Sequence, residues 1–233
     1  MQDNKEKISV GDKIIDFIQK NRKGIFITLG IVIFLFVGLI VFIALSEQIN
    51  KKAIAEVELL NDEFNDMRSD IINGEKTAEA NALIEKSKTF AEKNRGFPAG
   101  KAWSIAAQIY SIKENWQQAE EAWANCARAG EKTYLAPIAF FNAAVAAEEQ
   151  GRALQAIEYL KSCVSHNFEF PYAPRAQFNI GRLYEQLGNS AEAIEAYRAV
   201  LINWSWEQSA SGGSNTNIWQ NLARNQIIKL EVR

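Results

Sequence analysis

Residues 174–201 read PRAQFNIGRLYEQLGNSAEAIEAYRAVL and carry a pattern that occurs twice more, 37 residues earlier each time. Small residues mark the period at two places in each copy: Ala107, Ala144 and Gly181 at the first, and Ala119, Ala156 and Ala193 at the second. A fixed period of this length is typical of arrays built from one repeated unit. The region after residue 45 is rich in Ala, Glu, Gln and Asn, and the whole chain has 4 Pro, a composition that favours helices. We therefore expect an all-α array.

The last copy resembles the tetratricopeptide repeat (TPR). The residues that carry the resemblance are Ile180-Gly181, Tyr184, Leu187-Gly188-Asn189, Ala193 and Tyr197. It implies three helical hairpins within 100–208, beginning near residues 100, 137 and 174 and stacked into a right-handed α-solenoid. The family period is about 34 residues. We expect the extra residues of each copy in the turns between repeats, at 130–132 and 170–172.

Helical patterns also precede these repeats, in region 46–99. Residues 47–72 form the first pattern, with four apolar residues at alternating four- and three-residue steps: Leu60, Phe64, Met67 and Ile71. Residues 77–93 read as a partner helix with three residues pointing inward: Ala82, Leu83 and Phe90. The two helices resemble a degenerate first hairpin, bringing the array to three or four. The same spacing also suits a coiled-coil seam, so a homodimer through this helix is the alternative.

The C-terminal region 209–233 is expected to close the array. Its first part, SASGGSNTN at 209–217, reads as a polar loop. An amphipathic helix follows, with apolar residues at Ile218, Trp219, Leu222, Ile227 and Leu230. Repeat arrays need a terminal element that covers their last open face, and this helix is the candidate cap.

Residues 24–45, GIFITLGIVIFLFVGLIVFIAL, contain no charge. About 20 apolar helical residues cross a bilayer core, so these 22 residues predict a single transmembrane helix. Lys20, Arg22 and Lys23 precede it, which predicts a cytoplasmic tail at 1–23 and an external domain. The tail either contains a short amphipathic segment or is loosely ordered and only sets the topology. In a bacterium this is an inner-membrane protein with a periplasmic domain. A cleaved signal peptide is the alternative, but its apolar core is only about 7–15 residues long.

Composition argues against catalysis and against nucleic-acid binding. The chain has 26 basic and 28 acidic residues, so it lacks the strong positive charge that attracts nucleic acid. It has one histidine, His166, and two cysteines, Cys126 and Cys163, too few for the clusters that metal or hydrolytic sites need. The cysteines lie 37 residues apart, which places them about 10 Å apart in stacked repeats, beyond disulfide range. We expect buried free thiols, no cofactor, no metal and no enzymatic activity.

The TPR resemblance also implies which side chains face a protein partner. The second, fifth and ninth positions of each repeat line the concave side in this family. Here they are Lys101, Ser104 and Gln108, then Ile138, Phe141 and Val145, then Arg175, Phe178 and Arg182. Phe141 and Phe178 would stand side by side between cationic edges, which suits a segment with a hydrophobic anchor and an acidic group. Alternatively, the two rings are partly core, covered by inter-repeat turns or by the C-terminal helix.

The whole arrangement resembles the bacterial ancillary translocon-subunit family, whose members sit beside the Sec channel and are linked to periplasmic chaperones. The resemblance implies a membrane-anchored interaction module that assists a translocation or chaperone assembly. A structural scaffold in another envelope machine, such as a secretion, division or flagellar complex, is the first alternative. An enzyme or small-ligand-binding protein is the second, and no residue pattern supports it.

Overall fold

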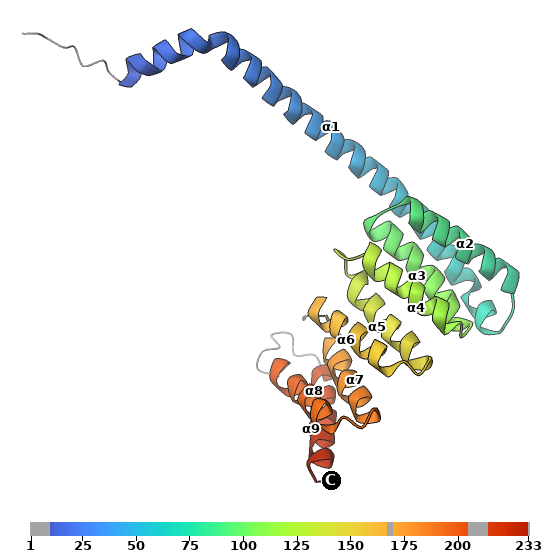
Figure 1. The fold of residues 1–233 in the computed structure, drawn as a ribbon. Helices are drawn as coiled ribbons and strands as arrows, with labels where there is room; N and C mark the ends of the chain where they lie inside the picture. The colour runs from blue at the N-terminus through green and yellow to red at the C-terminus, as the bar shows by residue number, and fades with distance from the viewer. Residues whose placement is uncertain (1–9, 167–169, 205–213, 233) are drawn as a thin grey trace, which may run out of the picture. The chain divides into compact units, whose positions relative to one another are not determined.

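The computed structural model describes residues 10–166, 170–204 and 214–232, and every regular element among them is an α-helix (Figure 1). The all-α prediction is therefore confirmed for the described chain. The helices are α1 Val10–Ile72, α2 Thr77–Lys93, α3 Gly96–Ile112, α4 Trp116–Ala129, α5 Leu135–Glu149, α6 Ala153–His166, α7 Ala173–Gln186, α8 Ser190–Asn203 and α9 Ser214–Glu231. The described chain divides into two compact units after Lys52.

The first unit is the N-terminal part of α1. Between residues 19 and 52, every side chain that the structure describes is exposed. Among the described helices, α1 alone has the length and composition to cross a membrane, and its most apolar stretch has a hydropathy of 3.1 with no part buried. Helix α1 includes part of the expected tail, the apolar stretch and the helix expected from residue 47 onward.

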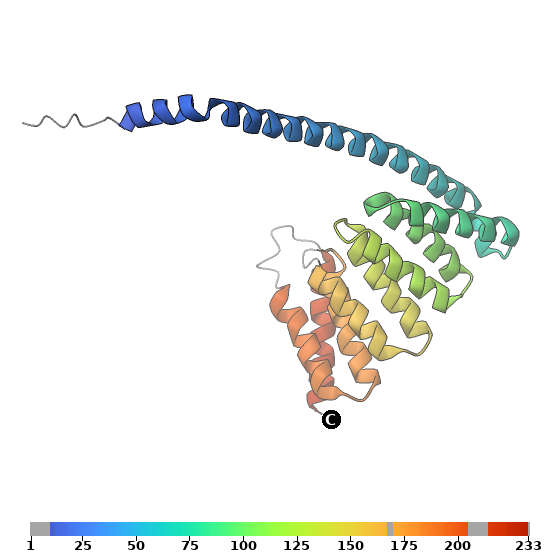
Figure 2. The ribbon, with the colours of Figure 1, turned by 45° about the horizontal axis from the view of Figure 1, so that its top comes forward.

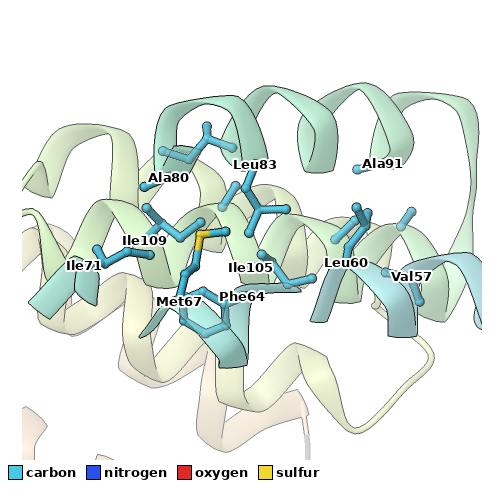
Figure 3. Packing of buried hydrophobic residues seen from close by; sticks show 14 residues of the cluster. Val57, Leu60, Phe64, Met67, Ile71, Ala80, Leu83, Ala91, Ile105 and Ile109 are labelled. Carbon is cyan, nitrogen blue, oxygen red and sulfur yellow. The ribbon is translucent and has the colours of Figure 1, made fainter. Parts of the chain in front are cut away.

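The second unit starts with α1 from Ala53 onward, packed with α2 and α3. Side chains from all three helices meet in one core, as Figure 3 shows for Met67, Leu83 and Ile105. Leu60, Phe64, Met67 and Ile71 are all buried in this core, so the predicted seam packs within the chain. One inward residue of α2 was wrongly chosen, because Ala82 is exposed and Ala80 is buried in its place.

Three helical hairpins follow: α3 with α4, α5 with α6, and α7 with α8, each packed on the next (Figures 1 and 2). The second helices begin at Trp116, Ala153 and Ser190 and end at Ala129, His166 and Asn203. Both sets of boundaries are spaced by 37 residues, which confirms the period predicted from the small residues.

Gly181 shows why a small residue is needed where the two helices of the third hairpin cross. A Cβ built at this position would lie 2.6 Å from the ring of Tyr197 on α8. Tyr197 is fully buried, and its phenol oxygen donates a hydrogen bond to Oε2 of Glu185 at 3.2 Å. Burial also raises the pKa of this phenol above its ordinary value. The glycine therefore makes room for the largest fully buried side chain of the array.

The turn inside each hairpin uses a left-handed residue at one repeat position. Gly151 and Gly188 adopt φ values of 71° and 78° there. The first of the three hairpins has Glu114 at the same position, with φ 56°. A side chain makes this conformation costly, by about 1 kcal/mol or more. The turn at Glu114 is therefore strained relative to the two that follow.

Glu120 is a buried carboxylate between the first and second hairpins. It lies on α4 and is only 6% exposed. Its oxygens accept hydrogen bonds from Gln150 Nε2 at 2.9 Å and from the Tyr159 hydroxyl at 3.2 Å, and Arg152 pairs with it. The equivalent residues of the next two repeats are Ile157 and Ile194. Polar contacts therefore join α4 to α6 and to the turn between α5 and α6.

Helix α9 packs against α8 and α7, as expected of a cap. Ala223, Ile227 and Leu230 form its buried side. The helix begins earlier than predicted, since residues 214–217 are helical, and residues 209–213 of the predicted loop lie outside the described residues. Three further apolar residues of α9 are exposed: Ile218, Leu222 and Ile228.

Candidate protein-interaction surface

The candidate surface lies on the odd-numbered helices of the array. Helix α3 contacts α5, and α7 contacts α9, in addition to the contacts within and between successive hairpins. These helices carry all eight predicted partner-binding residues: Lys101, Gln108, Ile138, Phe141, Val145, Arg175, Phe178 and Arg182. These residues differ in their burial and in the side chains that they contact.

Phe141 and Arg175 come together. The guanidinium carbon of Arg175 on α7 lies 5.1 Å from the centre of the Phe141 ring on α5. The same guanidinium lies 5.9 Å from the Trp219 ring on α9, and the Tyr172 ring lies 6.3 Å from that of Phe141. We call these four residues, Phe141, Tyr172, Arg175 and Trp219, the aromatic–arginine cluster. Cations over aromatic rings are attracted by the ring quadrupole, by about 0.5–1 kcal/mol at exposed sites.

Phe141 is half-buried, and other apolar residues of α5 lie on the same side of the helix. Ile138, Phe141 and Val145 follow one another at three- and four-residue steps, so they lie on one side of α5. Val145 is 40% exposed and Tyr172 is 52% exposed. An apolar strip therefore runs along α5 beside the charged group of Arg175.

Phe178 does not stand beside Phe141 on an open surface. Only 8% of it is exposed. Its ring packs on Tyr197 of α8 and on Trp219 of α9, with ring centres 5.1 and 5.4 Å away. The prediction of two neighbouring exposed rings is therefore wrong for Phe178. The alternative, a ring covered by the C-terminal helix, is the one observed.

Arg182 is not available as a free cationic edge. Its two terminal nitrogens donate to the two carboxylate oxygens of Glu148 on α5, at 2.7 and 2.6 Å. This hydrogen bonding raises the pKa of the Arg182 guanidinium above its ordinary value. Bidentate pairs of this kind fix both partners in orientation. Arg182 therefore joins α7 to α5.

The residues on α3 are separate from the cluster. Lys101 and Gln108 are half-buried, and the Gln108 amide donates to the Ser104 carbonyl at 3.1 Å. Ser104 is itself buried and donates to the Lys101 carbonyl at 2.7 Å. Among the described residues, neither Lys101 nor Gln108 touches the aromatic–arginine cluster.

Two members of the cluster were not predicted. Tyr172 lies in the inter-repeat turn before α7, and Trp219 lies on the capping helix. Neither falls on a concave position of the 37-residue repeat, so the repeat pattern could not select them. Tyr172 precedes Arg175 by three residues, which was an available signal, whereas no sequence signal placed Trp219 beside Arg175.

The two cysteines are buried, whereas the histidine is exposed. Cys126 and Cys163 are both free and buried, as predicted. Burial raises the pKa of each thiol to about 12, so neither forms a nucleophilic thiolate at neutral pH. His166 is exposed, with its ring 6.1 Å from that of Phe140. Among the described residues, no group of three or more His, Cys, Asp or Glu side chains is placed to hold a metal ion.

The array also matches known proteins. The family model described as "Soluble NSF attachment protein, SNAP" matches residues 68–227, more than half of the chain. The chain belongs to this family. The SNAP-family match covers the end of α1 and helices α2 to α8, and it reaches into α9.

A curated relative of this SNAP-family chain is a "TPR repeat-containing protein" of Treponema pallidum. The two are 34% identical over 157 residues, which cover 66% of this chain and 61% of the relative. A crystal structure of nearly identical kinesin light chain TPR-like repeats from Podosopora anserina matches the fold with a TM-score of 0.50. That match covers 76% of this chain and 94% of the other at 15% identity, so it bears on the fold alone. The chain is thus a TPR-type helical repeat protein, a class typical of protein–protein interaction.

Proposed function

We propose that this chain is a membrane-anchored interaction module on the periplasmic face of a bacterial inner membrane, where it assists a translocation or chaperone assembly. The observation that carries the proposal is α1, whose uncharged stretch from Gly24 to Leu45 is helical throughout. Every side chain described in that stretch is exposed. A long exposed stretch of uncharged, mostly apolar residues is unfavourable in water and has the composition expected in lipid.

The orientation is proposed from the charges beside this stretch. Lys20, Arg22 and Lys23 are exposed immediately before it. Positive residues are retained on the cytoplasmic side of membranes, so the repeats are assigned to the opposite side. Glu47 and Lys51 follow the stretch and form an ion pair at 2.7 Å, so their two charges cancel.

The interaction role is proposed for the aromatic–arginine cluster and the apolar strip of α5. Aromatic and arginine side chains are enriched where proteins bind one another. The cluster provides three rings and one cation within a short distance, on a rigid array of helices. A partner from an envelope translocation or chaperone assembly would contact this surface.

A structural scaffold of another envelope machine is the second candidate function. It is favoured by the exposed side of α9, where Ile218 is 52% and Ile228 is 55% exposed. A scaffold subunit would use such an end surface to join a neighbour, and it would not depend on Phe141 or Arg175.

Reporter fusions test the topology. Alkaline phosphatase, which is active only outside the cytoplasm, is fused after Arg233, and a fluorescent protein that matures only in the cytoplasm is fused there in a second strain. We expect phosphatase activity and no fluorescence. Fluorescence without phosphatase activity would contradict the periplasmic assignment. A carbonate wash of the membranes separates an integral anchor, which stays in the pellet, from a cleaved signal peptide.

Photo-crosslinking tests the interaction role in the same cells. A photoreactive phenylalanine replaces Val145 on the strip, and in a control strain it replaces the exposed Leu154 on α6. We expect a crosslinked translocation or chaperone subunit from position 145 and not from position 154. Recovery of a division, secretion or flagellar subunit would favour the scaffold function.

A further inference from the structure

Among the described residues, Arg175 lacks the carboxylate partner that three other arginines of the same unit have. Arg152, Arg182 and Arg198 each pair with a carboxylate: Glu120, Glu148 and Glu231. The described part of the chain offers Arg175 no such partner, and its contacts are the Phe141 and Trp219 rings. Arg175 is exposed, so its N–H donors face solvent or a binding partner. A guanidinium has five donors in a fork that matches a carboxylate.

The guanidinium is also held in place. Its two ring contacts come from two different helices, α5 and α9, while Arg175 lies on α7 between them in the array. Trp219 is itself fixed by its 5.4 Å contact with the buried Phe178. A side chain that is already restricted loses less conformational entropy when it binds a ligand. The unpaired charge is therefore preorganised.

The surroundings of Arg175 are apolar on one side. Ile138, Phe141 and Val145 form the strip on α5, and Tyr172 is half exposed beside Phe141. The strip extends over eight residues of helix, from Ile138 to Val145, about 10 Å in length. This length fits one or two side chains of a bound segment. A ligand that fills both parts must carry an apolar side chain next to a negative charge.

We propose that Arg175 binds a Glu or Asp side chain of a partner protein, in a segment whose adjacent apolar residue packs on Phe141 and Tyr172. The proposal deepens the proposed interaction role and rests on it. The charge complementarity comes from Arg175 alone, because Arg182 is occupied by Glu148 and Lys101 lies outside the cluster. The carboxylate accepts two hydrogen bonds from the guanidinium, and the apolar residue is removed from water.

The test uses the full chain purified in detergent and two matched fluorescent peptides. One peptide carries Leu next to Glu in a Ser/Gly background, and its twin carries Gln in place of Glu. Hydrogen bonds to charged groups are worth about 1.5–3 kcal/mol, so we expect the Glu peptide to bind at least about tenfold more tightly than its twin. Fluorescence anisotropy measures both affinities. Equal affinity for the two peptides would overturn the proposal.

Variants then assign the effect to Arg175. Arg175→Gln should abolish the preference for Glu, and Arg175→Lys should keep only part of it, because an ammonium lacks the planar fork. Arg128→Gln is the matched control, since it removes an exposed arginine on α4, outside the cluster. Thermal melting followed by circular dichroism confirms that each variant is folded. A Glu preference that survives in folded Arg175→Gln would also overturn the proposal.

The crosslinking strain separates this inference from the proposed function. If position 145 captures a periplasmic partner equally well with and without Arg175→Gln, the interaction role stands and the carboxylate site is wrong. If the fusions place the repeats in the cytoplasm while the peptides still discriminate through Arg175, the carboxylate site stands and the periplasmic assignment is wrong.

Discussion

Two pairs of equivalent residues show how the repeats of this array differ. Cys126 and Cys163 lie 37 residues apart on α4 and α6, and both are fully buried. Phe141 and Phe178 lie 37 residues apart on α5 and α7, yet one is half-buried and the other is almost completely covered. The two cysteines thus keep equivalent surroundings in successive repeats, whereas the two phenylalanines do not.

The difference arises from the next helix along the array. Phe141 is contacted from α7 by Arg175, whose charged end must stay hydrated, so the ring remains partly open. Phe178 is contacted from α9 by Trp219, whose aromatic ring covers it and shields it from water. One repeat position therefore serves packing in one place and recognition in another, according to its neighbour. Four experiments test this comparison.

The largest expected effect is that of Phe178→Ala. Removing a buried aromatic side chain typically costs about 3–5 kcal/mol, because the packing of Tyr197 and Trp219 is lost as well. Phe141→Ala should cost clearly less, since its ring is already partly hydrated. Urea denaturation followed by circular dichroism compares the two variants. Equal losses would show that the two phenylalanines are equivalent after all.

Gly181→Ala is expected to have the next largest effect. The added Cβ would meet the Tyr197 ring at 2.6 Å, and overpacking of this kind costs about 1–3 kcal/mol. The second repeat indicates the compensation, because it combines Ala144 with Leu160 at the equivalent positions. Tyr197→Leu should therefore cost less in the Gly181→Ala background than in the wild-type chain. A double-mutant cycle measured by thermal melting checks this, and strict additivity would contradict the close crossing.

Glu114→Gly is expected to stabilise the chain by about 1 kcal/mol, because glycine adopts a left-handed turn without a Cβ clash. The turn geometry should stay unchanged, since the Asn115 amide donates to the Tyr110 carbonyl at 2.9 Å through the backbone alone. Gly151→Glu is the reciprocal variant and should destabilise by a similar amount. Melting temperatures report both effects. A loss of stability in Glu114→Gly would reveal a contribution of the Glu114 side chain.

The smallest expected effect at neutral pH is that of cysteine ionisation on stability. Burial raises both thiol pKa values from 9.0 to about 12, so folding keeps the thiols protonated. Their contribution to stability is complete below about pH 9, where unfolded thiols are also protonated, and it is lost as the pH rises toward 12. We expect no labelling of the native chain by iodoacetamide at pH 7.5 and labelling of both thiols in urea. Rapid native labelling of one cysteine would show that the surroundings of the two cysteines differ as well.

The sequence was sufficient for the helical array because the period is carried by residues that must be small. Ala107, Ala144 and Gly181 recur at this period, and a Cβ at Gly181 would lie 2.6 Å from the Tyr197 ring, so the period and the three hairpins could be predicted together. The free, buried cysteines followed from the same period.

The surface was only partly predictable, because its outcome depends on contacts that do not repeat. Trp219 covers Phe178 from a helix that follows a segment of a different composition, and no period relates it to the earlier repeats. Arg182 was predicted as a free cationic edge, but in the structure it pairs with Glu148 on another helix. Phe141 and Arg175 were predicted as an aromatic ring and part of its cationic rim, and in the structure the two side chains do meet.

The carboxylate of Glu120 gives the repeats a fixed order. Its partners Gln150, Arg152 and Tyr159 all come from the following hairpin, while the later repeats carry Ile157 and Ile194 at the equivalent place. If the second repeat were deleted or exchanged for the third, a buried charge would face a hairpin that lacks these donors. Such orphaned charges cost about 3–5 kcal/mol. Although the backbone is modular, its units are not interchangeable, and recombination between them would be selected against.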